Sequence, residues 1–213
     1  MKVISIITAR GGSKGIPDKN IIDINGFPLI YYSIKASLNS KVIETWVSTD
    51  CEKIAAIAKS YPGVFISNRP KHLANDIVHA EEALIQFSED YDYDLLVFIQ
   101  PTSPMIKPEY INAGISMMKS GKYDSVFSVT EEHWIPRWDK DVNPIKWSID
   151  KRPRRQDKDP TYVENGMFYI TSRSALLKNK LRYGGKMGFV KIPLKNSFQI
   201  DSLEDLDLIK KII

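Results

Sequence analysis

The sequence predicts an α/β protein with a doubly wound, mostly parallel sheet, and three observations support this prediction. Short β-branched runs alternate with amphipathic segments along most of the chain. The run at 95–99 is apolar throughout, as expected of a strand buried on both faces of a sheet. A glycine-rich basic loop follows the first run, at the kind of strand end where open α/β sheets bind ligands. We therefore expect one domain over 1–213.

The β-branched and apolar runs give the expected strands in chain order. They lie at 3–7, 45–48, 64–66, 95–99, 125–129, 167–170 and 189–192. Because helix-type segments separate most of them, parallel pairing through βαβ units is expected.

The amphipathic segments give the expected helices. They lie at 28–38, 52–59, 79–88, 108–119, 172–177 and 202–212. Pro28 suits a first helical turn, and Asp201 or Ser202, followed by Glu204 and Asp205, suits the N-cap of the last helix. Asp50 likewise precedes a helix, so its simplest interpretation is an N-cap.

The segment 131–160 interrupts this pattern. It holds three of the four tryptophans (Trp134, Trp138 and Trp147), four prolines and mixed charge, with weak periodicity. That aromatic content is too high for a disordered linker. We expect an excursion from the sheet that packs on a partner subunit or over the functional site.

Charge and composition exclude several classes of function. The net charge is only +4, from 30 basic and 26 acidic residues, which does not indicate nucleic-acid binding. The local basic cluster Arg152, Arg154, Arg155 and Lys158 suits a polyphosphate or carboxylate substrate. A single cysteine, Cys51, excludes an internal disulfide or a cysteine metal site. No signal peptide or membrane span is indicated, so a cytoplasmic location is the expectation.

The three histidines are scattered. His72, His79 and His133 show no metal-ligand spacing, so we interpret them as structural or surface residues.

The loop 8–20 is the first candidate site. It contains three glycines, the cations Arg10, Lys14 and Lys19, and Ser13. Glycines let backbone N–H groups approach an anion, and the cations can neutralise phosphate charge. A nucleotide triphosphate is the ligand this favours, and a surface turn with solvated cations is the alternative. The spacing fits neither a P-loop nor the dinucleotide fingerprint.

Two further segments carry polar groups near strand ends. Gln100-Pro101-Thr102-Ser103-Pro104 is a stiff loop after the central strand, with an amide that can donate and accept hydrogen bonds. Arg69 follows the third strand, and its fork of donors suits recognition of a base or a phosphate.

These motifs, in this order, resemble the CMP-sialic acid synthetase (acylneuraminate cytidylyltransferase) family. The resemblance rests on Ala-Arg-Gly-Gly-Ser-Lys-Gly and Lys-Asn at 9–20, Ser-Thr-Asp at 48–50, and Arg-Pro and Leu-Ala-Asn-Asp at 69–76. It continues with Gln-Pro-Thr-Ser-Pro at 100–104, Arg-Arg-Gln-Asp at 154–157, Tyr-Val-Glu-Asn-Gly at 162–166, and the segment 199–206. It therefore spans nearly the whole chain.

The resemblance implies a nucleotide-diphospho-sugar transferase-like fold and a reaction of CTP with a free α-keto acid sugar, giving the CMP-sugar and pyrophosphate. The implied nucleotide-binding residues are Ala9, Arg10, Gly11, Gly12, Ser13, Lys19, Asn20, Arg69 and Asn75. The implied sugar-binding residues are Gln100, Arg155, Asn165 and Gly166, with Arg155 as the natural reader of a carboxylate. Asp201 is the implied Mg²⁺ ligand, and Arg10, Lys19, Gln100 and Asp201 are the implied catalytic residues. The excursion at 131–160 resembles a dimerisation element, which implies a homodimer.

The chain departs from the family pattern at three places. Gln199 replaces the first aspartate of the metal motif, so either Asp201 with phosphate oxygens holds the metal or a water intervenes. Val163 stands where some sialic acid enzymes have arginine, and 77–80 lacks the usual serine or threonine. Two alternatives stay open. One is a nucleotidyltransferase for a sugar 1-phosphate or an eight-carbon acid sugar, which Gln100-Pro101-Thr102-Ser103-Pro104 disfavours. The other is a nucleotide-binding homologue without turnover.

Overall fold

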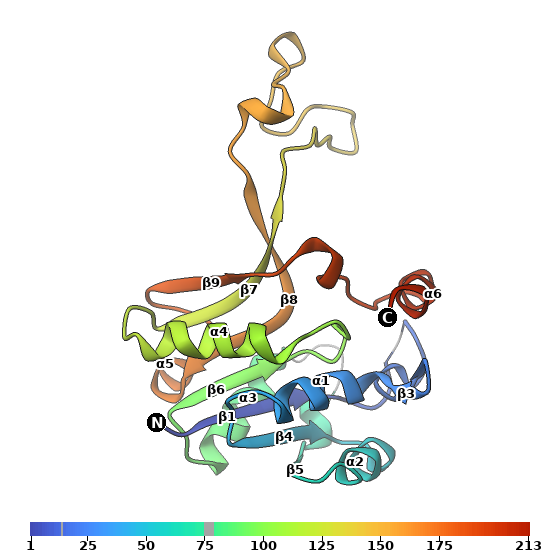
Figure 1. Ribbon diagram of the computed structural model, residues 1–213, viewed down its shortest axis with the longest axis vertical. Helices are drawn as coiled ribbons and strands as arrows, with labels where there is room; N and C mark the ends of the chain where they lie inside the picture. Colours follow the sequence, from blue (N-terminus) through green and yellow to red (C-terminus); the bar gives the residue numbers. More distant parts are fainter. Residues whose placement is uncertain (14, 75–78) are drawn as a thin grey trace.

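The computed structural model describes residues 1–13, 15–74 and 79–213, and a seven-stranded sheet forms its centre (Figure 1). The strand order is β5-β4-β1-β6-β8-β7-β9. The strands are β1 (Val3–Thr8), β4 (Glu44–Thr49), β5 (Val64–Asn68), β6 (Leu95–Ile99), β7 (Ser125–Glu132), β8 (Thr161–Ser172) and β9 (Met187–Lys191). Only β8 runs against the others in this sheet. The predicted fold class, an α/β protein with a mostly parallel sheet, is confirmed.

Helices cover both faces of the sheet. They are α1 (Leu29–Leu38), α2 (Glu52–Lys59), α3 (Ala80–Asp90), α4 (Pro108–Lys119), α5 (Arg173–Asn179) and α6 (Leu203–Ile212). The core under α1, α2 and α4 contains Ile34, Ile54 and Ile115, and the core under α3 and α5 contains Phe87 and Leu176. Each buried aliphatic or aromatic side chain of this kind contributes about 2 kcal/mol. No described helix has the length and apolar character needed to cross a bilayer.

A third apolar cluster fixes α6 beside the loop after β1. Ile16 from that loop and Ile200 before α6 are both buried in it, together with Leu206 and Ile209 of α6. A small hairpin of β2 (Asp23–Ile24) and β3 (Phe27–Pro28), which the periodicity does not predict, adds Ile24 to the same cluster. This packing holds the basic loop next to the residues that precede α6.

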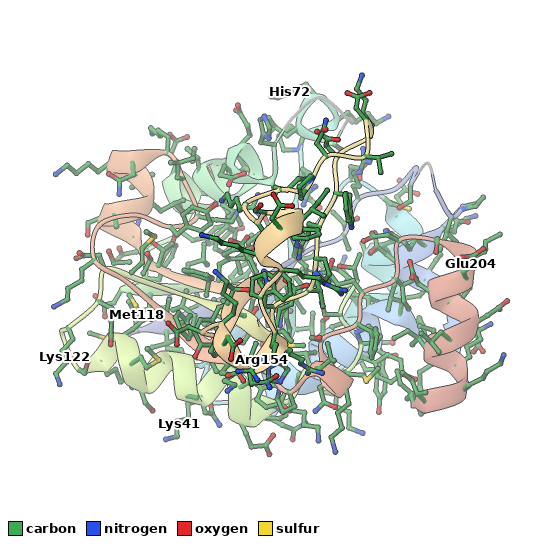
Figure 2. All side chains as sticks on the ribbon, turned by 90° about the horizontal axis from the view of Figure 1, so that it is seen from above. Lys41, His72, Met118, Lys122, Arg154 and Glu204 are labelled. Atoms are coloured by element: carbon green, nitrogen blue, oxygen red, sulfur yellow. The ribbon has the colours of Figure 1, made fainter. Side chains whose placement is uncertain are left out.

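The excursion is an arm that β7 and β8 carry away from the sheet (Figure 1). Strand β8 begins at Thr161 rather than at the expected 167, because its first residues pair with the end of β7 outside the main sheet. Within the arm, Trp147 packs edge-on against Trp138 with ring centroids 4.9 Å apart. Figure 2 looks along the arm, with Arg154 near the middle of the view and Glu204 of α6 at its margin.

A bulge in β8 marks the point where the arm leaves the sheet. Phe127 of β7 lies opposite Tyr169, whereas Val129, only two residues later, lies opposite Glu164. The extra residues of β8 are held by Ser128, whose hydroxyl donates to Asn165 Oδ1 at 2.6 Å and accepts from the Phe168 N–H at 3.1 Å. The motif Tyr-Val-Glu-Asn-Gly therefore forms a hydrogen-bonded bulge within a long strand.

The two predicted helix caps have different outcomes. Ser202 caps α6 in a capping box with Asp205, as one of the two expected arrangements. The prediction for Asp50 is wrong, because Cys51 occupies the N-cap of α2 and makes no side-chain capping bond. The Asp50 carboxylate instead accepts the N–H of Gly11 at 2.9 Å, a partner 39 residues away along the chain.

Candidate functional site

A cleft of about 590 Å³ lies at the carboxyl ends of the parallel strands β1 and β6, where an α/β sheet is expected to bind its ligand. It brings together the basic loop, the residue after β5, the loop after β6 and the segment before α6. The lining residues are Thr8, Arg10, Ser13, Gly15, Lys19, Asn20, Arg69, Leu73, His79, Ala80, Gln100, Pro101, Thr102, Gln199 and Asp201.

Bonds to the ends of neighbouring elements shape the basic loop. The Ala9 N–H donates to the Ser48 carbonyl at 3.0 Å, which extends the pairing of β1 with β4. The Asn20 amide donates to the Arg10 carbonyl at 2.9 Å and closes the loop on itself. Because Asp50 takes the Gly11 N–H, that group is not a free anion donor as the sequence suggested. The loop is thus fixed by its own chain.

Lys19 is bonded within the cleft. Its Nζ donates to Asp201 Oδ1 at 3.0 Å and to the Ile200 carbonyl at 3.1 Å. The Lys19 side chain is only 17% exposed, whereas Asp201 is 67% exposed. The packing of Ile16 and Ile200 therefore places the predicted phosphate-binding lysine beside the predicted metal ligand, although the two are 182 residues apart.

Arg69 is the most buried cation of the site, at 8% exposure. Its Nε donates to Ser48 Oγ and its Nη2 to the Ser48 carbonyl, both at 3.3 Å. Burial lowers the pKa of Arg69 to about 10, with a further lowering by Arg10 and an opposing effect of Asp50. The guanidinium therefore stays charged at neutral pH, and its burial is a cost that an anionic ligand would offset.

The loop after β6 forms the opposite wall of the cleft. The Gln100 N–H donates to the Met167 carbonyl at 3.2 Å, which ties the loop to the bulge of β8. The Thr102 carbonyl accepts the Ile200 N–H at 2.9 Å, which ties it to the segment before α6. Gln100, Pro101 and Thr102 therefore face the cleft from a doubly anchored loop.

A second pocket, of about 500 Å³, lies where the arm meets the sheet. It is lined by Thr130, Glu131, Glu132, His133, Ile135, Arg155, Val163, Glu164, Asn165, Leu194, Ser197 and Gln199. Of the predicted sugar-binding residues, Arg155 and Asn165 line this pocket and Gln100 lines the cleft. Gly166 stands between them, against Gln100 and Gln199.

The structure separates the predicted site residues into groups. Arg10, Ser13, Lys19, Asn20, Arg69, Gln100 and Asp201 line the cleft, while Ala9, Gly11 and Gly12 belong to the same loop without being lining residues. Lys14, Asn75 and Asp76 lie outside the described residues. His79 also lines the cleft, a position that its isolated place in the sequence did not indicate. The contribution of Asp50 was also missed, because an acid before a helix is usually a cap.

The acidic residues that line the cleft determine how a metal ion could bind there. Within the described ranges, no group of three or more His, Cys, Asp or Glu side chains could hold a metal ion. Asp201 is the one acidic residue among those that line the cleft in this part of the chain. One carboxylate together with substrate phosphate oxygens is a common Mg²⁺ ligand set, so the residues present fit a nucleotide-borne Mg²⁺.

Comparison with known proteins identifies the family. A family described as Cytidylyltransferase matches residues 4–212. The chain belongs to the cytidylyltransferase family. Among its relatives, N-acylneuraminate cytidylyltransferase A of Danio rerio is 35% identical over 214 residues, which cover 96% of this chain and 49% of the relative. CMP-N,N'-diacetyllegionaminic acid synthase of Legionella pneumophila is 34% identical over 196 residues, 86% of this chain and 83% of the relative.

These relatives confirm the family predicted from the motifs, that of the CMP-sialic acid synthetases. The chain spans about half the length of the first vertebrate and streptococcal relatives it matches. A solved structure of CMP:2-keto-3-deoxy-manno-octonic acid synthetase complexed with CTP is similar in fold. Its TM-score is 0.76 at 17% identity, covering 100% of this chain and 98% of that one. At this identity, the likeness supports the fold of this cytidylyltransferase.

Proposed function

We propose that this cytidylyltransferase couples CTP to a free α-keto acid sugar, sialic acid or a related nonulosonic acid, and releases pyrophosphate. The observation that carries the proposal is the cleft, which Arg10, Lys19 and Arg69 line together with Asp201, the one carboxylate among its described lining residues. Such a set suits a triphosphate with its metal. The names of the relatives, which specify N-acylneuraminate and diacetyllegionaminic acid, support the class of acceptor.

In the proposed nucleotide complex, Arg10 and Lys19 neutralise the phosphates, and Ser13 donates to them. Arg69 and Asn20 contribute to binding from deeper in the cleft, and Asn75 is proposed as a further nucleotide-binding residue. Asp201 would hold Mg²⁺, which when bound supplies neutralisation of charge on the phosphate oxygens. Lys19, whose Nζ lies 3.0 Å from Asp201 Oδ1, then exchanges its bond to Asp201 for one to the triphosphate.

In the proposed reaction, the anomeric hydroxyl of the acid sugar attacks the α-phosphorus in line. A new oxygen–phosphorus bond forms, the bond to pyrophosphate breaks, and the hydroxyl proton passes to solvent. Gln100 lies at the edge of the cleft and positions the acceptor, whereas Arg155 in the second pocket binds its carboxylate. Catalysis on this account rests on positioning and charge neutralisation.

The same proposal takes residues 1–213 as one cytidylyltransferase domain that forms a homodimer through the arm. Large apolar side chains of the arm are exposed, including Ile135 at 52%, Val142 at 71% and Ile149 at 65%. Side chains of this kind are typical of surfaces that another chain covers. Light scattering would show a dimer on this account, and a monomer at micromolar concentration would contradict it.

Pyrophosphate release tests the proposed function. The protein is incubated with CTP and Mg²⁺ against a panel of free α-keto acid sugars, with ATP, GTP and UTP as controls. We expect release with CTP and one or more nine-carbon acid sugars. Release only with an eight-carbon acid sugar or a sugar 1-phosphate would contradict the proposed acceptor. CTP binding without release across the panel would indicate a nucleotide-binding homologue.

A further inference from the structure

Gln199 occupies the boundary between the two cavities. Of the described residues, it is the one that lines both the cleft and the second pocket. The mechanism proposed above does not use it, and the family resemblance places a metal-binding aspartate at this position. Its surroundings therefore decide whether it continues that role or has another one.

The Gln199 amide faces protein acceptors. Its Nε2 donates to the Asn165 carbonyl in the bulge of β8, and it lies 3.5 Å from Ser103 Oγ, a fully buried hydroxyl. A carboxylate oxygen in the place of Nε2 would lie against the Asn165 carbonyl oxygen and be repelled by it. The position is therefore built for a hydrogen-bond donor, which a metal-binding carboxylate cannot be.

The side chains of Gln199 and Gln100 both lie against the backbone of Gly166. Gly166 has φ +65°, and a Cβ built on it would lie 2.5 Å from Gln199 Nε2 and 2.9 Å from Gln100 Oε1. Since Gly166 follows Asn165, the two glutamines contact one short turn of β8 from the same side, the side on which a Cβ of Gly166 would lie. We call the side chains of Gln100 and Gln199 around this turn the amide clamp.

The sheet holds the other side of the bulge. Asn165 Nδ2 donates to Thr130 Oγ1 at 3.1 Å, and its Oδ1 accepts from Ser128, so its side chain is directed into the sheet. The opposite side of the turn, toward the cleft, is held by the amide clamp. The turn therefore forms a wall with the nucleotide cleft on one side and the second pocket on the other.

We propose that Gln199 is a positioning residue, whose amide fixes the Asn165–Gly166 turn as the partition across which the acceptor sugar reaches the nucleotide. The metal is then left to Asp201 and not to Gln199. This inference rests on the proposed function for its effect on the acceptor, but the clamp itself can be measured without turnover.

The test replaces Gln199 by methionine, which has a similar length and no donor. We expect hydrogen exchange of the backbone amides at 164–168 to become about tenfold faster, as for loss of a hydrogen bond to a buried carbonyl. With the acid sugar found in the panel, we expect its KM to rise about tenfold, while the KM of CTP and the half-saturating Mg²⁺ concentration change less than about twofold.

Asn39→Asp is the matched control. Asn39 Nδ2 donates to the Lys35 carbonyl at 2.8 Å at the exposed end of α1, so this variant also removes an amide-to-carbonyl bond. It should leave exchange at 164–168, both KM values and the Mg²⁺ requirement unchanged. Gln199→Glu keeps the shape of the side chain and adds a negative charge. It should raise the KM of the acid sugar at least as much as Gln199→Met does.

The outcomes separate the inference from the proposed function. A rise of about tenfold in the Mg²⁺ requirement of Gln199→Met, with unchanged exchange at 164–168, would overturn the inference and make Gln199 part of the metal site. Unchanged exchange and unchanged KM would overturn it as well. Faster exchange at 164–168 in a protein that turns over no acid sugar would support the clamp and refute only the proposed function.

Discussion

Two arginine–carboxylate pairs in this chain have the same bidentate geometry in very different surroundings. Arg182 donates to Glu81 with distances of 2.6 and 2.8 Å, and Arg154 donates to Asp157 with distances of 2.9 and 3.0 Å. The first pair is 18% and 15% exposed, and the Arg182 guanidinium also stacks 4.9 Å from the ring centre of Tyr169. The second pair, on the arm, is 73% and 42% exposed.

A similar contrast separates the cleft from the arm. The cleft is built from anchored loops, and its cations have partners within the chain, such as Asp201 for Lys19 and Ser48 for Arg69. The arm carries exposed apolar side chains and an ion pair that solvent screens. The cleft proposed for the nucleotide is therefore already formed within a single chain, whereas the exposed apolar surface of the arm suits a further binding partner.

The largest effect is expected from the cation that links the basic loop to α6. Replacing Lys19 by alanine should lower kcat/KM for CTP about 100- to 1000-fold, because a charge directed at the triphosphate is lost. Steady-state pyrophosphate release measures this. Lys35→Ala, which removes an exposed lysine stacked on Tyr31, is the control and should have no effect. An effect of less than about threefold for Lys19→Ala would contradict the assignment.

The buried ion pair should contribute strongly to stability in a pH-dependent way. Burial opposes ionisation of Glu81, but the hydrogen bonds and charge of Arg182 outweigh it and lower the pKa of Glu81 below its ordinary value. The stabilisation is therefore present above the unfolded pKa of about 4.3 and lost as the pH falls through the lower folded pKa. We expect Glu81→Gln to lower the free energy of unfolding by about 2–4 kcal/mol at pH 7.

Urea unfolding at pH 7 and at progressively lower pH measures this difference. The difference in the free energy of unfolding between wild type and Glu81→Gln should become smaller as the pH falls below 4. Asp157→Asn, the same type of change on the arm, should leave unfolding unaltered at every pH. A difference in the free energy of unfolding that stays constant with pH for Glu81→Gln would contradict this account. An equal difference for Glu81→Gln and Asp157→Asn would show that the buried pair and the exposed pair do not differ.

Gly166→Ala should disturb the partition between the cavities. An alanine there would have a strained positive φ and a Cβ 2.5 Å from Gln199 Nε2. We therefore expect the free energy of unfolding to fall by about 1–3 kcal/mol and the KM of the acid sugar to rise. Gly121→Ala is the control, since Gly121 has φ +71° with open space around it. Equal thermal unfolding shifts in the two variants would show that the amide clamp adds nothing to the backbone strain.

The smallest of these effects should come from the arm. Arg155→Ala should raise the KM of the acid sugar about tenfold through loss of a carboxylate partner, with the KM of CTP unchanged. Lys151→Ala, at another exposed basic position of the arm, is the control. A change in the CTP KM as large as that for the sugar would place Arg155 at the triphosphate instead.

The sequence predicted local features and missed those that depend on distant partners. The limits of α2 and α4 follow from periodicity alone and agree with the structure. The length of β8 does not, because its first half is a strand only through pairing with β7. Asp50 was interpreted as a cap since no local signal reveals its bond to Gly11. The motifs still placed Arg10 and Gln100 in one cleft, because strand ends of a parallel sheet converge. Lys19 and Asp201 join them through the apolar cluster of Ile16 and Ile200.

The most direct test of the contrast between the regions is calorimetric titration of CTP with Mg²⁺ into a variant whose residues 134–159 are replaced by a short glycine–serine linker. If the nucleotide site is complete within the sheet, CTP should bind with a Kd within about threefold of that of the full chain, while acid-sugar-dependent pyrophosphate release is lost. Loss of CTP binding from a variant that still unfolds cooperatively would contradict the account, because the arm would then be part of the nucleotide site.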